Sequence, residues 1–299
     1  MGSRGEPVKI GQRVVLLTRP EKILFPDGIT KGELIKYYHD IAPHMLPHIE
    51  DRPLSLQRWP DGIDRPGFFQ KSVADYYPSW IKRVTVKKAG GTVTHAICSD
   101  AATLVYLANQ ACITPHIWLS RTPKLLYPDQ MVFDLDPSGD TFGWVKAAAR
   151  SVRALLDELG LAAYVKTTGS RGLHVVVPLK PRHSYGDVYR FATTLASLVV
   201  QQEPRQRTLE FSKSKRGGRV FIDTNRNAYA QTVAPAFAVR ARAGAPVSVP
   251  IEWDELDRKG LRSDGWTIRT VFDRLAKTQD PWKDFGRRRT SLKAAAAKL

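Results

Sequence analysis

The chain has 299 residues, 42% of them hydrophobic, and a formal net charge of +17 from 46 lysines and arginines against 29 aspartates and glutamates. This composition excludes an intrinsically disordered protein, and no apolar run reaches the roughly 18 residues that a membrane-spanning helix needs. The positive charge is spread along the chain and predicts a polyanionic partner, nucleic acid rather than a membrane surface. The alternative is a merely basic, soluble protein. Cys98 and Cys112 match no metal-ligand or disulfide pattern, which favours a reducing cytoplasm.

The N-terminal part, residues 11–128, follows residues 1–10, which we interpret as a disordered tail or an expression remnant. Thr30 followed by Glu33 has the form of a capping box and predicts a helix whose apolar residues continue at helical spacing to Met45. The other predicted elements are strands at 13–18, 54–59, 83–86 and 92–98, a basic turn at 87–91 and a helix at 101–110. A proline-containing, charged connector at 121–128 marks the expected boundary.

The second part, residues 129–299, has a clearer order of elements. It predicts a strand, a helix, two strands, a helix and a last strand, at 131–135, 141–159, 162–166, 173–179, 184–202 and 220–223, with an extra strand at 208–211. This is the split βαββαβ pattern, in which the first and last strands are neighbours in the sheet. The sequence therefore predicts an α/β (mixed α+β) fold, with one principal sheet and a smaller N-terminal α/β part packed on it as one compact domain.

Asp134 and Asp136 end the first strand of this pattern and project from the same face. Two carboxylates at such a short separation repel each other, and a hard divalent cation such as Mg2+ or Mn2+ removes this repulsion. If strand 220–223 is the neighbour, Asp223 lies beside them. Three carboxylates can hold two metal ions, one activating an attacking 3′-hydroxyl and one holding a triphosphate. The alternative is a pair of aspartates that simply begin a turn before Pro137.

A second group of residues, Thr-Gly-Ser-Arg-Gly-Leu-His at 168–174, combines glycines with polar donors. The glycines let backbone amides approach a phosphate, and Ser170 and Arg171 add donors. His174, on the strand that follows, can donate to a triphosphate oxygen. The alternative is an ordinary hairpin turn, which explains the glycines but not the flanking Arg and His.

Other residues have both a functional and a structural interpretation. Lys215, Arg216, Arg226 and Arg240 surround strand 220–223 and could bind a triphosphate. His116 could contact a nucleotide or a metal, and the aromatic pair Phe68 and Phe69, on a loop among basic residues, suits base stacking. Lys22 and Lys31 lie beside the capped helix and could form an anion site. The structural interpretations are a solvated face, a structural histidine, core packing and ordinary surface lysines.

Four motifs occur in a specific order: PEKILFPDGITKGELIKYY with RWPDGIDRPGFFQK, then VFDLDP, TGSRGLH and FIDTNRN. Together they resemble the polymerase domain of bacterial DNA ligase D, in the archaeo-eukaryotic primase superfamily, from about Val14 to Trp282. The resemblance implies a primase-like catalytic sheet. It also implies a DNA-directed nucleotidyltransferase of nonhomologous end joining, which fills gaps and adds (ribo)nucleotides at double-strand break ends. Two divalent cations, with Mn2+ preferred over Mg2+, and an NTP or dNTP substrate are implied as well.

The resemblance also implies roles for individual residues. The metal ligands and catalytic residues are Asp134, Asp136 and Asp223; the nucleotide contacts are His116, Ser170, Arg171, His174, Arg216, Arg226 and Arg240; the 5′-phosphate contacts are Lys22 and Lys31; the template-stacking pair is Phe68 and Phe69. The turn at 87–91 falls where the family has a loop that helps bring ends together. Arg171 stands where the family also uses lysine, and Arg226 replaces a neutral group near the sugar.

The implied partners are double-stranded DNA ends, gapped DNA with a 5′-phosphate, the Ku protein, and a DNA ligase module in cis or in trans. The implied location is the cytoplasm, at the nucleoid, with no membrane partner. Two alternatives remain. A metal-dependent glycosyltransferase also uses an Asp-x-Asp pair, although the spread positive charge and the third aspartate argue against it. A non-catalytic module that binds DNA ends and recruits a ligase is the other.

Overall fold

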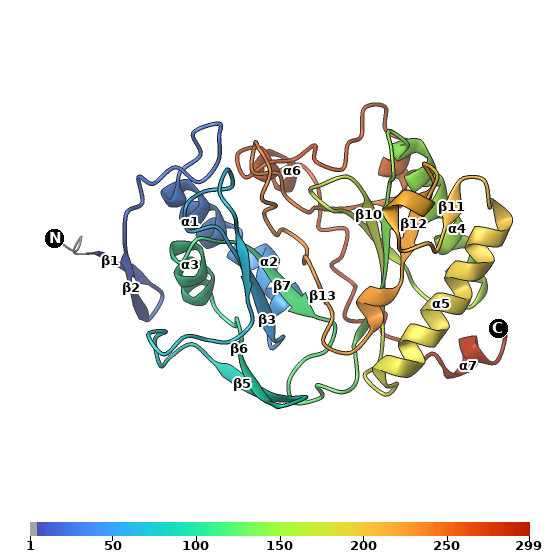
Figure 1. Ribbon diagram of the computed structural model, residues 1–299, viewed down its shortest axis with the longest axis horizontal. Helices are drawn as coiled ribbons and strands as arrows, with labels where there is room; N and C mark the ends of the chain where they lie inside the picture. The colour runs from blue at the N-terminus through green and yellow to red at the C-terminus, as the bar shows by residue number, and fades with distance from the viewer. Residues whose placement is uncertain (1–4) are drawn as a thin grey trace. The chain divides into compact units, whose positions relative to one another are not determined.

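The computed structural model describes residues 5–299, which divide into two compact units (Figure 1). The first contains the residues up to Trp118 together with Ala234–Val247 and Trp266–Phe272, and the second contains Leu119–Val233, Ser248–Gly265 and Asp273–Leu299. The chain thus returns twice to the first unit, whereas the sequence suggested a single boundary at residue 128. A sequence pattern shows where an element ends, but it does not show which later segment packs back on an earlier one.

The first unit contains both helices and strands. Its elements are β1 (Glu6–Ile10), β2 (Arg13–Leu17), α1 (Lys31–Asp40), α2 (Ala42–Ile49), β3 (Leu54–Arg58), β4 (Phe68–Gln70), β5 (Arg83–Lys88), β6 (Gly91–Ala96), α3 (Ala101–Asn109) and β7 (Cys112–Trp118). Strand β3 lies between β7 and β4, and β5 and β6 form the predicted basic hairpin. The sequence did not predict β7, because Pro115 in its middle cannot donate a ladder hydrogen bond.

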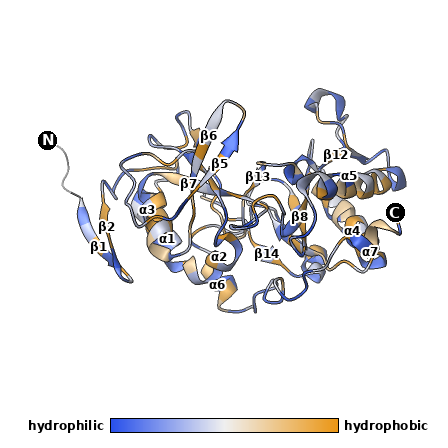
Figure 2. Cartoon of the chain, turned by 90° about the horizontal axis from the view of Figure 1, so that it is seen from below, coloured by the Kyte–Doolittle hydropathy of each residue, from blue (hydrophilic) through white to orange (hydrophobic). Residues whose placement is uncertain are grey.

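The predicted disordered tail is wrong for Glu6–Ile10, which form β1 and pair along their full length with β2. Residues 1–4 of that predicted tail lie outside the described residues. In Figure 2, β1 has the hydrophilic colour and β2 the hydrophobic colour. Val14 and Leu16 of β2 are nevertheless exposed. The strand predicted at 13–18 is present as β2, and β1 is added to it by the backbone ladder, which hydrophobic periodicity does not reveal.

The predicted capping box at Thr30 is present at the start of α1. The Glu33 amide donates to Thr30 Oγ1 over 3.2 Å, and the Thr30 amide donates to Glu33 Oε2 over 2.9 Å. The single helix that the sequence predicted to continue to Met45 is two helices, since a proline at the start of α2 removes a donor that a continuous helix would need. Helix α1 therefore ends at Asp40.

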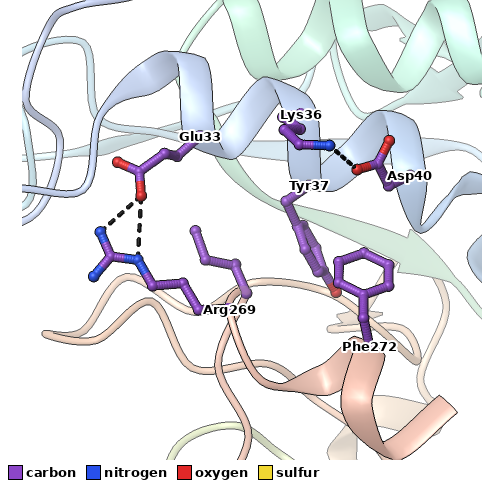
Figure 3. A pocket seen from close by; sticks show the side chains of 7 residues that line it. Glu33, Lys36, Tyr37, Asp40, Arg269 and Phe272 are labelled. Carbon is purple, nitrogen blue, oxygen red and sulfur yellow. Dashed lines mark hydrogen bonds and ion pairs between the residues drawn. The ribbon is translucent and has the colours of Figure 1, made fainter. Parts of the chain in front are cut away.

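One later segment of the first unit packs on α1 (Figure 3). Arg269 donates from Nε and Nη2 to Glu33 Oε1, at 3.2 and 2.7 Å, and the Phe272 ring meets the Tyr37 ring edge-on at 5.9 Å between centroids. Together with Lys36, Asp40 and Ile268 these side chains line a hollow of about 380 Å3. Glu33 therefore takes part in both the capping box of α1 and the ion pair with Arg269.

The second unit is built on one six-stranded sheet. Its elements are β8 (Gln130–Asp136), α4 (Phe142–Glu158), β9 (Tyr164–Thr167), β10 (Leu173–Pro178), α5 (Tyr185–Gln202), β11 (Arg207–Thr208), β12 (Val220–Asp223), β13 (Thr232–Val233) and β14 (Pro250–Ile251), then α6 (Val271–Leu275), where the chain passes from the first unit to the second, and α7 (Lys293–Ala296). The strand order is β11-β12-β8-β10-β9-β14. The predicted βαββαβ order and the pairing of its first and last strands, β8 and β12, are confirmed.

Helices α4 and α5 carry their buried residues at helical spacing: Val145, Ala148, Ala149, Val152 and Leu156 in α4, and Val188, Phe191, Ala192, Leu195 and Val199 in α5. Ser184 and Asp187 form the capping box that begins α5. Strand β11 is shorter than predicted because the Glu210 amide donates to Thr208 Oγ1 and turns the chain, which leaves Phe211 exposed. Within the described residues, no helix is long and apolar enough to cross a membrane.

Candidate active site

Three carboxylates lie on one face at the end of the second unit's sheet. Asp223 of β12 is the register partner of Asp134 of β8, and Phe221 is that of Asp136. Residues opposite each other in an antiparallel pair have neighbouring side chains on the same face, and Asp136 is two residues from Asp134. The three aspartates therefore share one face, as the sequence predicted from the strand order. Asp134 and Asp223 are buried.

A histidine and an arginine contact these carboxylates. His174 of β10 is the register partner of Asp134, and its Nε2 lies 3.2 Å from Asp134 Oδ1. Arg226 Nε lies 3.4 Å from Asp134 Oδ2 and 3.4 Å from Asp223 Oδ2. Arg226 was expected beside the sugar of a nucleotide, and in this structure its guanidinium instead bridges two of the predicted metal ligands.

The contacts shift the pKa values of the three carboxyl groups in different directions. Burial alone would raise the pKa of Asp134, but the charge and hydrogen bond of His174, then Arg226 and Lys166, outweigh it and lower the pKa. Burial, followed by the charge of Asp134, raises the pKa of Asp136 to about 6. Burial also raises the pKa of Asp223, against the opposing charge of Arg226. Burial therefore opposes the charged forms of Asp136 and Asp223, whereas the neighbouring cations hold Asp134 ionised.

A divalent cation would relieve the repulsion among these carboxylates. Among residues 5–299, no three His, Cys, Asp or Glu side chains are gathered closely enough to hold a metal ion, and Arg226 lies against two of the aspartates. The donor set nevertheless has the right chemistry: three carboxylates on one face, two of them with raised pKa values. Asp134, Asp136 and Asp223 are the residues that would hold the metal, in place of the Arg226 ion pairs.

Asp136→Asn is expected to raise the melting temperature of the metal-free protein by several degrees at pH 7.5. The pKa of Asp136 rises from 3.8 to about 6 on folding, so keeping the carboxylate charged destabilises the fold above pH 6. That penalty disappears as the pH falls towards the unfolded pKa, so the two proteins should melt alike near pH 4. Thermal melts with a chelator from pH 4 to 8 measure this, with the exposed Asp273→Asn as control. An unchanged difference across that range would contradict the prediction.

The loop at residues 168–172 follows β9 and is fixed by its own hydroxyls. Thr168 Oγ1 accepts from the amides of Ser170 and Gly172, each at 3.2 Å. A Cβ on Gly172 would lie 2.0 Å from the Leu135 carbonyl oxygen, so only glycine fits there. The loop is thereby held in contact with the strand that carries Asp134 and Asp136.

A second segment, which no pattern in the sequence indicated, supports the same loop. Ser263 Oγ donates to the Gly172 carbonyl over 2.6 Å, and the Gly169 amide donates to the Ser263 carbonyl over 3.0 Å. A hollow of about 320 Å3 opens there, lined by Pro137, Gly139, Asp140, Phe142, Ser170, Arg171, Leu261, Arg262, Ser263 and Asp264. Ser170 and Arg171 therefore face a space next to the strand that bears the carboxylates.

Lys166 is a second residue that the sequence analysis missed. It is the register partner of His174, is buried, and donates to Ser248 Oγ over 2.6 Å. A lone lysine in the strand Tyr164–Thr167 was the available signal, but a charged residue at a strand end is usually exposed. Arg216 is buried as well: its Nε and Nη2 donate to the carbonyls of Glu210 and Phe211, at 3.1 and 2.9 Å.

The first unit holds the predicted phosphate contacts. The Lys31 amide donates to the Lys22 carbonyl over 2.8 Å, which brings the two residues together. Lys31 is buried, and its Nζ donates to Thr18 Oγ1 and the Asn109 carbonyl, at 3.3 and 3.2 Å. Lys22 Nζ pairs with Asp61 at 2.8 Å. Burial, with Arg19 next, lowers the pKa of Lys31 to about 8.

Phe68 and Phe69 lie in strand β4 and not on the loop where the sequence placed them. They are 47% and 53% exposed, which excludes core packing as the reason for this aromatic pair. Arg58 lies over the Phe68 ring at 5.5 Å, and the Phe69 ring meets His116 at 5.3 Å between centroids. His116 Nε2 lies 3.2 Å from Gln57 Oε1.

Arg240, the last predicted nucleotide contact, also belongs to the first unit, where its amide donates to the Pro246 carbonyl over 2.8 Å. The structure therefore gathers Asp134, Asp136, Asp223, Ser170, Arg171, His174, Arg216 and Arg226 in the second unit, and Lys22, Lys31, Phe68, Phe69, His116 and Arg240 in the first.

Comparisons with known proteins all identify the same family. A model described as "LigD, primase-polymerase domain" matches residues 30–282. The chain is 37% identical over 270 residues to the multifunctional non-homologous end joining protein LigD of Mycolicibacterium smegmatis, covering 89% of this chain and 35% of that protein. It is 33% identical over 286 residues to the Pseudomonas aeruginosa LigD, covering 94% and 34%. The chain thus spans about a third of the length of these relatives.

A solved structure, the polymerase domain from Mycobacterium tuberculosis ligase D in complex with DNA, has a TM-score of 0.87 with this fold at 34% identity. The match covers 92% of this chain and 99% of that one. With the family model spanning most of the chain, these likenesses extend well beyond the carboxylate motif. The chain belongs to the family of LigD primase-polymerase domains, which are DNA-directed nucleotidyltransferases.

Proposed function

We propose that this chain extends a primer 3′-hydroxyl by attack on the α-phosphate of a nucleoside triphosphate, with release of pyrophosphate, to fill gaps and extend ends at double-strand breaks. The observation that carries the proposal is the register pair of Asp223 and Asp134, with Asp136 on the same face of the sheet. A chain of this family with that arrangement needs no protein nucleophile, because positioning and charge stabilisation perform the transfer.

In the proposed reaction, two divalent cations held by Asp134, Asp136 and Asp223 would activate the primer hydroxyl and neutralise charge on the leaving pyrophosphate. Ser170 and Arg171 line the hollow beside β8 and are placed to hold phosphate oxygens. His174 donates to Asp134 and orients that carboxylate. Arg226 pairs with Asp134 and Asp223 in the metal-free structure, and these ion pairs would give way to bound metals.

The finer parts of the proposal concern preference and partners. We propose Mn2+ over Mg2+, ribonucleotides as well as deoxyribonucleotides as substrates, and gapped DNA with a downstream 5′-phosphate as the preferred form. We also propose that the chain acts with Ku and with a ligase module, in cis or in trans, at double-strand break ends in the nucleoid. The support is the chain's likeness to multifunctional end-joining proteins and to a polymerase domain solved with DNA.

Primer extension on a short-gapped DNA tests the proposal directly. The assay compares Mn2+ with Mg2+, NTPs with dNTPs, and a downstream 5′-phosphate with a 5′-hydroxyl. Extension that requires a metal and is faster with the 5′-phosphate supports a gap-filling enzyme. Binding that depends on the 5′-phosphate, without extension in either metal, would instead support the non-catalytic end-binding module.

Lys31→Ala is expected to reduce the advantage of a 5′-phosphorylated gap by about 10-fold or more, the usual value of a hydrogen bond between charged groups. The pKa of Lys31 is about 8, so in the wild type this advantage should fall as the pH rises through 8 and the ammonium loses its proton. The value of kcat/KM on phosphorylated and unphosphorylated gaps from pH 6.5 to 9.5 measures both effects, since kcat/KM reports the free enzyme.

Lys36→Ala is the matched control, since Lys36 is an exposed lysine on the same helix. It should leave the advantage of the 5′-phosphate and its pH dependence unchanged. If Lys31→Ala lowers kcat/KM equally on both gaps, the residue supports the fold of this region and does not bind the phosphate.

A further inference from the structure

The C-terminal segment of the second unit runs beside the stretch that leaves β10. Thr290 forms a bridge with Leu179, and the Lys180 amide donates to the Thr290 carbonyl over 2.9 Å. The Leu292 amide donates to His183 Nε2 over 3.0 Å, which fixes α7 next to the start of α5 (Figure 1). Two basic stretches that are distant in sequence are thereby joined into one surface.

This surface is densely cationic. Its exposed charged side chains, which we call the C-terminal cationic face, are Lys180, Arg182, Arg287, Arg288 and Lys293. Asp284 lies beside Arg287 at 3.4 Å, and both side chains are largely exposed, so this pair neutralises little in water. The face therefore keeps most of its positive charge.

A hollow of about 420 Å3 adjoins the face, lined by Arg287, Arg288, Arg289 and Thr290 together with residues at the end of α4 and after it. Two polar atoms there, Arg289 Nε and Thr290 Oγ1, are buried and have no hydrogen-bond partner within residues 5–299. Buried polar groups are normally paired, so these two donors are available to an incoming acceptor. Arg289 itself donates from Nη2 to Asp129 over 3.3 Å, so the exposed Arg287 and Arg288 are the arginines of this hollow that suit a phosphate group.

The face lies at the far end of the strand from the carboxylates. His174, which contacts Asp134, is near the start of β10, and Lys180 follows its end. Six residues of extended chain span about 20 Å at roughly 3.3 Å per residue. A ligand phosphate on this face is therefore too distant to be part of a nucleotide at the aspartates.

We propose that the C-terminal cationic face binds the phosphate backbone of duplex DNA, as a contact separate from the catalytic face. An acidic protein partner fits less well, because protein interfaces are built around apolar anchors, and this face is a run of lysines and arginines. Interfaces with DNA are polar and strongly positive, and arginine forks match phosphate oxygens. The contact is sequence-independent, since it reaches only the backbone.

The salt dependence of binding tests this contact without relying on catalysis. A blunt 30-base-pair duplex is titrated by fluorescence anisotropy from 50 to 300 mM salt with the full chain, the variant Arg287→Ala/Arg288→Ala/Lys293→Ala, and the variant Arg150→Ala/Arg190→Ala/Arg205→Ala. The second variant removes the same charge from other surface positions of the same unit. Each phosphate contact contributes about 0.9 to the slope of log K against log salt.

The expected result is a slope smaller by about 2 to 3 for the first variant and by less than about 1 for the second. The charge-preserving Arg287→Lys/Arg288→Lys should keep the wild-type slope, which separates lost charge from misfolding. Equal slopes for the two alanine variants would overturn the proposal. A poly-glutamate probe tests the alternative of an acidic protein partner: if the Arg287/Arg288/Lys293 variant lost binding to that probe but bound DNA as the wild type does, the proposal would also be overturned. Primer extension on a saturating gapped substrate should be unchanged, so a failure of the polymerase proposal would not be mistaken for a failure of this one.

Discussion

Replacing Asp136 with asparagine is expected to lower the rate of primer extension at least about 10^3-fold while DNA binding stays within about twofold. Asp136 shares the sheet face of Asp134 and Asp223, but it forms no ion pair with His174 or Arg226 among the described residues. The asparagine therefore removes a metal-binding charge without releasing a buried cation. Single-turnover extension at saturating Mn2+ measures the rate, and anisotropy measures DNA binding.

The same substitution is expected to stabilise the metal-free fold at neutral pH, so loss of activity would be accompanied by a higher melting temperature. That combination separates a catalytic role from a structural one. Asp273→Asn, on exposed surface in α6, should change neither quantity. Extension by the Asp136 variant within tenfold of the wild type would remove this aspartate from the metal site.

Arg274→Met is expected to destabilise the protein by about 3 to 5 kcal/mol, the usual effect of removing one partner from a buried ion pair. Arg274 and Glu255 are both buried and form a two-pronged pair, Nη1 to Oε1 at 2.6 Å and Nη2 to Oε2 at 2.7 Å. Methionine fills the space but leaves the Glu255 carboxylate buried beside only the partly exposed Arg258. Urea unfolding at pH 7.5 measures the change.

Arg269→Met provides the control, since Arg269 makes a similar forked pair with Glu33 on exposed surface. Its effect should be small because water screens the pair. Although burial opposes it, the hydrogen bonds of Arg274 lower the pKa of Glu255, so the wild-type advantage of the buried pair should shrink as acid protonates this carboxylate. Equal destabilisation by the two variants would show that burial does not decide the strength of these pairs.

The catalytic sheet was predictable because its elements obey local rules. The split βαββαβ order follows from helical and strand periodicity, and the topology then places Asp223 beside Asp134 although 223 and 134 are far apart in sequence. The same holds for the capping boxes at Thr30 and Ser184, since each is defined within four residues. Short-range patterns combined with one topological rule were sufficient for these features.

The rest depended on contacts that no short pattern encodes. Arg226 was assigned to a nucleotide, yet its position against two aspartates depends on how the chain turns after β12. Lys166 and Ser263 reach the site only through strand pairing and a distant loop. The return of Ala234–Val247 and Trp266–Phe272 to the first unit is likewise a packing outcome.

Gly172 has a consequence for how mutation can change this enzyme. Its missing side chain lets the loop 168–172 lie directly on the backbone carbonyl of Leu135, between the two aspartates of β8. Under the proposed mechanism, main chain against main chain would then set the distance between the triphosphate and the metals, and substitutions elsewhere in the loop would not change it. Substitutions of Ser170 or Arg171 could therefore change which nucleotide binds, but they would leave the distance between that nucleotide and the aspartates of β8 unchanged.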